Sequence, residues 1–195
     1  MGEIRPHFDL SLRLEGLLPF EELTCLDLGC GPYESIVARQ VLTFPWKKLL
    51  SVDGSNGSIL KAGLKETAAT EFEVRVSDVR GFAYCTPFDV TLSFDVLEHL
   101  EKKEGLEWLK HLEKITRKRI VLFFPCEPED FFRPVSAIED KDNPLQEHLS
   151  HWRSHELIAL GYRVEDIFEA HTEMKEDGTN ITFGAVWAIK NLPSQ

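Results

Sequence analysis

The chain has 195 residues, 43% of them hydrophobic and 28% charged, which is enough for one sizeable core but cramped for two. We therefore expect a single domain over residues 1–195. The formal net charge is −11, from 22 Lys and Arg against 33 Asp and Glu, and there is no basic stripe. This argues against extended nucleic-acid binding, because phosphate contacts need clustered cations.

The first half of the chain alternates predicted helices with predicted strands. A shared helical face predicts an N-terminal helix within residues 1–20, carried by Leu10, Leu14, Leu17 and Leu18. Strands are predicted at 24–28, 47–53 and 72–78, with helices at 34–42 and 59–64 between them. In the third strand, Phe72, Val74 and Val76 should point inward.

The second half continues this alternation and then departs from it. A strand at 88–94 leads to an amphipathic helix, whose buried side is Leu106, Leu109, Leu112 and Ile115, and to an apolar strand at 119–125. Such rounds specify an α/β doubly wound, mostly parallel sheet with helices on both faces. A helix at 154–160, with Ser154 as its N-cap, then precedes strands at 162–170 and 181–189. The turn KEDGTN between these strands predicts a hairpin and hence one antiparallel strand.

The cysteines and the apolar runs bear on the cellular setting. None of the cysteines has CxxC spacing, so we expect buried thiols in a reducing compartment at Cys25, Cys30, Cys85 and Cys126. No apolar run approaches a membrane span, and the N-terminal stretch MGEIRPHFDL lacks the features of an export signal. We expect a cytoplasmic protein with no membrane partner; its oligomeric state is left open.

The stretch CLDLGCGP, residues 25–32, is the most informative in the chain. It is an apolar strand that ends in a carboxylate and turns on Gly29 and Gly31, which accept positive φ and let a ligand approach the main chain. In a parallel sheet the carboxyl ends of the strands share one edge, where α/β proteins bind nucleotides. We therefore expect a nucleotide pocket there.

Three acids close three successive predicted strands, namely Asp27, Asp53 and Asp78. Each alone is more often a helix cap or turn residue, but three in register favour one shared crevice. Asp53 follows Gly31 at about the spacing from which an acid reaches ribose hydroxyls, and Asp78 is placed to meet an adenine amino group. Asp27 and Glu34 flank the turn, which disfavours a dinucleotide pyrophosphate and favours a cationic ligand such as a sulfonium.

At this point the chain resembles the Rossmann-like, class I S-adenosylmethionine-dependent methyltransferases. The resemblance covers most of the sequence through LDLGCG, SVDGS, VSDVRGF and FDVTLSFDVLEHL. It implies a sheet of about seven strands in the order 3-2-1-4-5-7-6, with strand seven antiparallel. The family often has a third glycine where this chain has Tyr33, which would crowd the methionine pocket or form part of its wall.

The resemblance also implies S-adenosylmethionine as cofactor and assigns its contacts. The glycine turn would hold the methionine portion of the cofactor, and the second acid would bind the ribose. The third acid and the main chain after it would bind the adenine. The main chain at the end of the fourth strand would form the floor under the amino-acid end. The cofactor-binding residues expected are Asp27, Gly29, Cys30, Gly31, Asp53, Gly54, Asp78, Val79, Ser93 and Phe94.

Two histidines are candidates for a general base. His99 follows the fourth strand, where catalytic groups often stand, although a structural hydrogen bond is the more common role there. His148 begins an HxSxW stretch that some small methyltransferases also contain. His148, His151 and His155 with Glu147 have spacings that metal sites share with many surface helices, and we expect no metal. Trp152 is either a substrate wall or a loop anchor.

The segment 126–153 suits a substrate loop. Its mixed aromatic and charged residues are typical of a lid or acceptor site, and equally of a solvated connection: Glu127, Glu129, Asp130, Phe131, Phe132 and Arg133. The sequence therefore predicts a methyltransferase acting on an oxygen or nitrogen atom of a small-molecule substrate. The alternatives are a protein or nucleic-acid acceptor, a non-catalytic cofactor-binding subunit, and a nicotinamide oxidoreductase.

Overall fold

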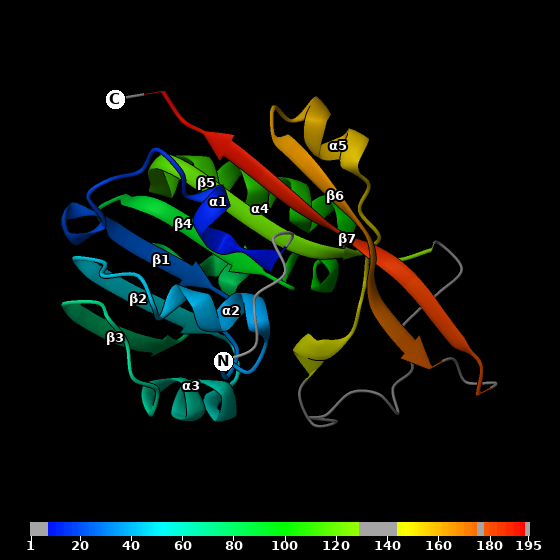
Figure 1. Cartoon of the computed structure of the whole chain (residues 1–195), viewed down its shortest axis with the longest axis horizontal. Helices are drawn as coiled ribbons and strands as arrows, with labels where there is room; N and C mark the ends of the chain where they lie inside the picture. The colour runs from blue at the N-terminus through cyan, green and yellow to red at the C-terminus, as the bar shows by residue number, and fades with distance from the viewer. Residues whose placement is uncertain (1–7, 129–143, 175–177, 194–195) are drawn as a thin grey trace.

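The computed structural model describes residues 8–128, 144–174 and 178–193. They form a seven-stranded sheet of order β3-β2-β1-β4-β5-β7-β6, as the resemblance implies (Figure 1). The strands are β1 (Thr24–Leu28), β2 (Lys48–Asp53), β3 (Glu71–Val76), β4 (Phe88–Phe94), β5 (Thr116–Cys126), β6 (Arg163–Met174) and β7 (Asn180–Asn191). The strands β1 to β5 pair in parallel, and β7 is antiparallel to both β5 and β6, which confirms the predicted hairpin.

Helices cover both faces of the sheet, because successive strand residues point to opposite sides. One hydrophobic cluster lies under α1 (Leu10–Arg13), α2 (Ile36–Val41) and α3 (Asn56–Gly63). The other lies under α4 (Lys102–Ile115) and α5 (Ser154–Ala159). In Figure 1, α1 and α2 lie in front of the sheet and α4 behind it. The short 3-10 helices are η2 (Phe20–Glu22), η3 (Val79–Gly81), η4 (Leu97–His99) and η6 (Pro144–Gln146).

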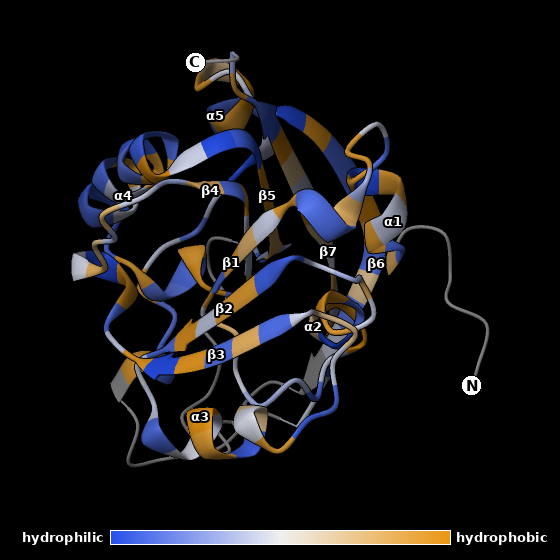
Figure 2. Cartoon of the chain, turned by 90° about the vertical axis from the view of Figure 1, so that its left-hand side faces the viewer, coloured by the Kyte–Doolittle hydropathy of each residue, from blue (hydrophilic) through white to orange (hydrophobic). Residues whose placement is uncertain are grey.

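Five local expectations are wrong. Cys85 is exposed and Cys126 is only partly buried, whereas Cys25 and Cys30 are buried as expected. The N-terminal helix spans only four residues, because the chain turns at Gly16, where φ is +81°, and leaves Leu18 75% exposed. Val76 is 46% exposed because β3 is an edge strand, and Figure 2 shows the alternating hydropathy of β3 at this edge. Leu106 is exposed, and Trp108 takes its place in the core. The N-cap of α5 is Arg153, since the Ser154 hydroxyl is bonded to Asp166.

No helix among the described residues is long and apolar enough to cross a bilayer. The predicted loop residues 129–133 and the turn residue Asp177 lie outside the described part of the chain. Residues 126–128 and 144–153 of the predicted substrate loop are described, and Glu127, Leu145, Gln146 and His148 from them line a cavity at the carboxyl ends of the strands.

Candidate active site

The glycine turn after β1 is hydrogen-bonded to the end of β2. The Gly29 and Cys30 amides donate to the Val52 carbonyl at 2.8 and 3.1 Å. Both Gly29 and Gly31 have positive φ, +75° and +55°. A Cβ on Gly29 would lie 2.0 Å from Val96 Cγ2, whereas a Cβ on Gly31 would meet nothing within 4 Å. Gly29 is therefore required by packing, and Gly31 leaves its side of the turn open.

Asp53 stands at the end of β2 and lines the same cavity as the turn. Its two carboxylate oxygens accept from the Gly31 amide at 3.0 Å and from the Ser55 amide at 2.8 Å. Burial raises the pKa of Asp53, and these two amide bonds oppose the shift. Because each carboxylate oxygen has more than one acceptor position, the side chain retains the capacity to bind a diol.

Asp78 also lines the cavity, as do Val79 and Gly54. Asp78 caps η3 and forms a two-oxygen ion pair with Arg80, whose Nε lies 3.0 and 2.9 Å from the carboxylate oxygens. The hydrogen bonds from Arg80 lower the pKa of Asp78. Of the three strand-end acids, Asp53 and Asp78 thus share one crevice, and Asp78 forms an ion pair with Arg80.

Asp27 lies behind Tyr33 and outside the lining of the cavity. It is 1% exposed, and the Tyr33 hydroxyl donates to its carboxylate at 2.6 Å and lies 2.6 Å from Ser51 Oγ. Burial raises the pKa of Asp27 to about 7, with Asp53 adding to the shift and the Tyr33 hydrogen bond opposing it. Tyr33, at a φ of +57°, therefore forms part of the cavity wall and seals Asp27 from it.

Of the two β4 residues expected to form the floor of the site, Phe94 lines the cavity and Ser93 does not. Phe94 lines the cavity, as does Cys30 from the turn, whereas Ser93 is buried and its hydroxyl donates to the Leu28 carbonyl at 2.8 Å. Ser93 therefore ties β4 to β1 beneath the site.

The cavity has a volume of about 450 Å³, within the usual range for a small-molecule site. Its lining is rich in acids, which are Glu34, Asp53, Asp78, Asp95, Glu98 and Glu127. Among the described residues, Arg80 is the single Lys or Arg of the lining, and it is paired with Asp78. Such a wall favours a ligand that carries positive charge.

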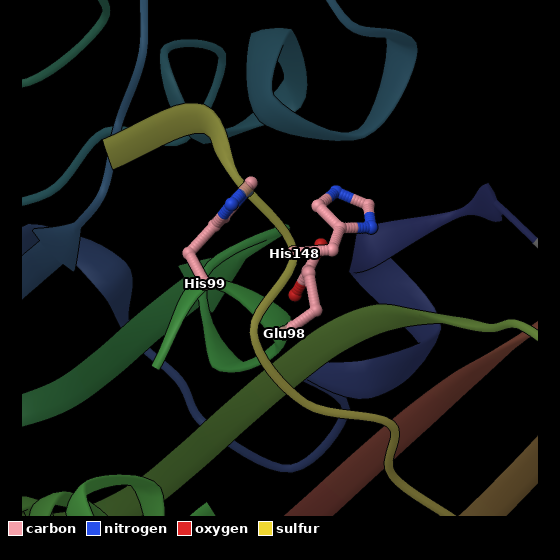
Figure 3. Close-up of side chains that lie close together, drawn as sticks. All are labelled: Glu98, His99 and His148. Carbon is pink, nitrogen blue, oxygen red and sulfur yellow. The ribbon is translucent and has the colours of Figure 1, made fainter. Parts of the chain in front are cut away.

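A second part of the wall comes from η4 and from the segment 144–152. The Leu149 and Ser150 amides both donate to the Glu98 carbonyl, at 2.8 and 3.1 Å. His99 and His148 meet edge to face with ring centroids 4.7 Å apart, and Figure 3 shows them beside Glu98. Both predicted histidines thus line the cavity, although they are distant in sequence.

Trp152 anchors this segment and does not line the cavity. It is 1% exposed within the cluster under α4, its indole donates to Ser150 Oγ at 2.8 Å, and Lys102 Nζ lies 3.7 Å from its ring centroid. Ser150 Oγ in turn donates to the Leu100 carbonyl at 2.7 Å. The HxSxW stretch thus combines two anchoring residues with one wall residue, His148.

Sequence reasoning did not assign several residues that line the cavity. Glu127 was noted only as part of a loop, yet its carboxylate lies 2.9 Å from His148 Nδ1. His171 and Phe183 come from β6 and β7, where a register shift between Ile167 and His171 bulges β6 and stacks the two rings at 5.4 Å. The bulge carries Glu169 at a φ of +53°, a conformation with no local sequence signal.

Comparison with known proteins supports the fold alone. No protein-family model matches the chain, and no curated protein matches its sequence. Among solved structures, TehB from Haemophilus influenzae is 15% identical, with a TM-score of 0.62 over 97% of this chain and 62% of TehB. This chain thus spans less than two thirds of TehB.

This chain spans a larger share of two further solved structures. An S-adenosylmethionine-dependent methyltransferase from Clostridium acetobutylicum is 14% identical, with a TM-score of 0.59 over 94% of this chain and 89% of its own. Magnesium protoporphyrin IX methyltransferase from Synechocystis, solved with bound S-adenosylhomocysteine, is 17% identical, with a TM-score of 0.57 over 93% and 78%. The chain therefore has the fold of the class I S-adenosylmethionine-dependent methyltransferases.

Proposed function

We propose that this protein is a cytoplasmic methyltransferase that moves the methyl group of S-adenosylmethionine to an oxygen or nitrogen atom of a small molecule. The observation that carries the proposal is the joint presence of the glycine turn and Asp53 on one acid-lined cavity. This cavity lies at the carboxyl ends of β1, β2 and β4 in a sheet with the methyltransferase strand order. The fold alone does not imply the reaction, so the site must carry the argument.

The residues of the cavity fit the proposed cofactor piece by piece. Gly29, Cys30 and Gly31 would hold the methionine portion, where the side-chain-free face of Gly31 leaves room. Asp53 and Gly54 would take the ribose. The adenine and the sulfur would contact the remaining cofactor residues, which are Asp78, Val79 and Phe94. Asp27 and Ser93 would act from beneath, by fixing Tyr33 and the strand ends.

The chemistry asks little of the protein beyond positioning. When bound, S-adenosylmethionine supplies a sulfonium, whose S–CH3 bond breaks with both electrons passing to sulfur as the acceptor atom bonds the methyl carbon. The chain must align the acceptor, exclude water and remove the acceptor's proton. His99 and His148 line the cavity and are our candidates to take that proton.

Calorimetric titration with S-adenosylhomocysteine tests the cofactor site. We expect the wild type to bind S-adenosylhomocysteine and not to bind NAD, because the acidic wall disfavours a pyrophosphate. Asp53→Ala should weaken S-adenosylhomocysteine binding by at least about tenfold, since the diol loses its hydrogen-bond acceptors. Asp166→Ala, an exposed change on β6, is the control and should leave the affinity unchanged. Unchanged affinity in Asp53→Ala would remove that residue from the site.

Methyl uptake from labelled cofactor tests the acceptor. Metabolite extracts should accept label, and macromolecular fractions should not. Label in protein or nucleic acid would establish the alternative acceptor class. Tight S-adenosylhomocysteine binding without uptake into any fraction would indicate a non-catalytic cofactor-binding subunit.

A further inference from the structure

The acceptor side of the cavity gathers metal-binding atoms in one place. A ligand atom from each of Glu98, His99 and His148 lies within 4.8 Å of the other two. With metal–ligand bonds of about 2.1 Å, neighbouring ligand atoms stand roughly 3 to 3.5 Å apart, so closing on an ion would move these side chains by about an ångström. Figure 3 shows the three side chains converging from η4 and from the segment that carries His148.

The hydrogen bonds of both imidazoles favour metal binding. His99 Nδ1 lies 3.0 Å from the Glu147 carbonyl oxygen, and His148 Nδ1 lies 2.9 Å from the Glu127 carboxylate. Both partners are acceptors, so each ring proton belongs on Nδ1 and the lone pair on Nε2. A carbonyl or carboxylate on the far nitrogen is the outer-shell arrangement that orients metal-binding histidines.

The main chain holds the two ligand-bearing segments together. The Glu98 carbonyl accepts from the amides of Leu149 and Ser150, the two residues that follow His148. Glu98 is 3% exposed, and the Glu127 and His148 side chains are 3% and 7% exposed. Buried and hydrogen-bonded groups thus hold Glu98 and His148 near a binding geometry, and a side-chain movement of about an ångström would complete it.

We propose that Glu98, His99 and His148 bind one divalent first-row transition cation at the acceptor side of the cavity. Two imidazoles and one carboxylate suit Mn²⁺, Fe²⁺, Co²⁺ or Zn²⁺ better than Mg²⁺ or Ca²⁺, which prefer oxygen ligands. Three protein ligands leave coordination positions for substrate, as in catalytic sites. The cluster differs from the His148, His151 and His155 set considered from sequence, since His155 is exposed and away from it.

The consequence for the reaction rests on the proposed methyltransferase function. A bound cation would select an acceptor that offers it a hydroxyl oxygen, such as a vicinal diol or catechol. With both imidazoles bound to the cation, neither His99 nor His148 would act as the base. Coordination would instead lower the pKa of the acceptor hydroxyl, so that its proton would pass to solvent and the oxygen would attack the methyl carbon. The inferred acceptor class is therefore a small molecule with chelating oxygen atoms, methylated on oxygen.

Metal titration of the full chain, after treatment with a chelator, tests the inference. Calorimetry with MnCl2 should give one equivalent bound with a dissociation constant below about 100 μM. Co²⁺ should give visible bands that report nitrogen ligation. His99→Ala and His148→Ala should each weaken Mn²⁺ binding by at least about tenfold. His155→Ala, at an exposed histidine of the adjoining helix α5, is the control and should bind as the wild type does.

S-adenosylhomocysteine binding, measured on the same samples, separates the two proposals and shows that each variant is folded. If the wild type binds S-adenosylhomocysteine but none of Mn²⁺, Co²⁺ and Zn²⁺, the metal site is refuted and the methyltransferase proposal stands. An equal loss in His155→Ala and His148→Ala would also refute this ligand set. Metal binding without S-adenosylhomocysteine binding would refute the methyltransferase function alone.

Discussion

The two halves of the cavity are built in different ways. The cofactor half, meaning the glycine turn and the end of β2, is joined by backbone bonds between neighbouring strands, such as that from Gly29 to Val52. The acceptor half, meaning η4 and the segment 144–152, is joined across about 50 positions of sequence by bonds such as that from Ser150 Oγ to the Leu100 carbonyl. The geometry of the cofactor half is therefore set by the pairing of the strands. The geometry of the acceptor half depends on how the segment 144–152 packs against η4.

This difference separates what the fold requires from what sets specificity. Changes in the cofactor half should disturb the core, because Gly29 contacts Val96 and Asp53 holds the turn. Changes in the acceptor half should mainly move the wall that carries His148. Single substitutions in each half test this division.

The largest expected effect is that of Gly29→Ala. The new methyl group would lie 2.0 Å from Val96 Cγ2, on a stiff β-branched side chain, at a φ of +75° that disfavours any side chain. We expect a loss of about 3 kcal/mol or more in the free energy of unfolding, measured by urea denaturation.

Gly31→Ala is the matched control, because its φ is also positive but its Cβ position is open. It should cost only about 1 kcal/mol and weaken S-adenosylhomocysteine binding instead. Equal losses of stability in the two variants would show that backbone conformation, and not packing against Val96, governs the turn.

The second effect is a pH dependence from Asp27. Its pKa is raised from 3.8 to about 7, so between these values the folded state binds more protons than the unfolded state. Stability from this group is therefore fully present at low pH and is lost as pH rises toward 7. From pH 5 to pH 8 the wild type should lose about 2 to 3 kcal/mol relative to Asp27→Asn.

Urea denaturation of both proteins across this pH range measures the difference, since other titrating groups contribute to both. A constant difference between the two proteins would mean that Asp27 does not titrate in this window.

Ser150→Ala should have the third largest effect. It removes the acceptor of the buried Trp152 indole and the donor to the Leu100 carbonyl. We expect a loss of about 1 to 2 kcal/mol in the free energy of unfolding, because a buried donor is left unsatisfied. Mn²⁺ affinity should fall as His148 shifts, whereas S-adenosylhomocysteine affinity should hold. Loss of S-adenosylhomocysteine binding instead would contradict the separation of the two halves.

The cofactor half was largely predictable from sequence because its elements are local. The pattern of β1 gave its bounds without error, and the spacing from Gly31 to Asp53 placed both residues on one cavity. The strand order came from the resemblance. Asp27 was expected to line the same crevice, and this is wrong, since nothing in the sequence shows that Tyr33 turns inward at a φ of +57° to cover it.

The acceptor half was less predictable because it depends on long-range contacts. The sequence indicates His99 and His148 as separate candidates. It does not show that hydrogen bonds to the Glu98 carbonyl bring their two segments together. His171 and Phe183 reach the cavity only through the bulge in β6. No periodicity reveals such a bulge, so these residues could be found only in three dimensions.

The smallest expected effect lies where the two halves meet. A Cβ on Gly54, in the cofactor half, would lie 2.3 Å from Leu145 Cδ1, in the acceptor half. Because this methyl is the end of a flexible side chain, Gly54→Ala should cost less than about 1 kcal/mol of stability. The displaced Leu145 lines the cavity, so S-adenosylhomocysteine affinity should fall about two- to threefold. Adding Leu145→Ala should restore it, because the contact between the two residues carries the effect. A double variant as weak as Gly54→Ala alone would mean that the added methyl group acts on the ligand directly and that the loop is not involved.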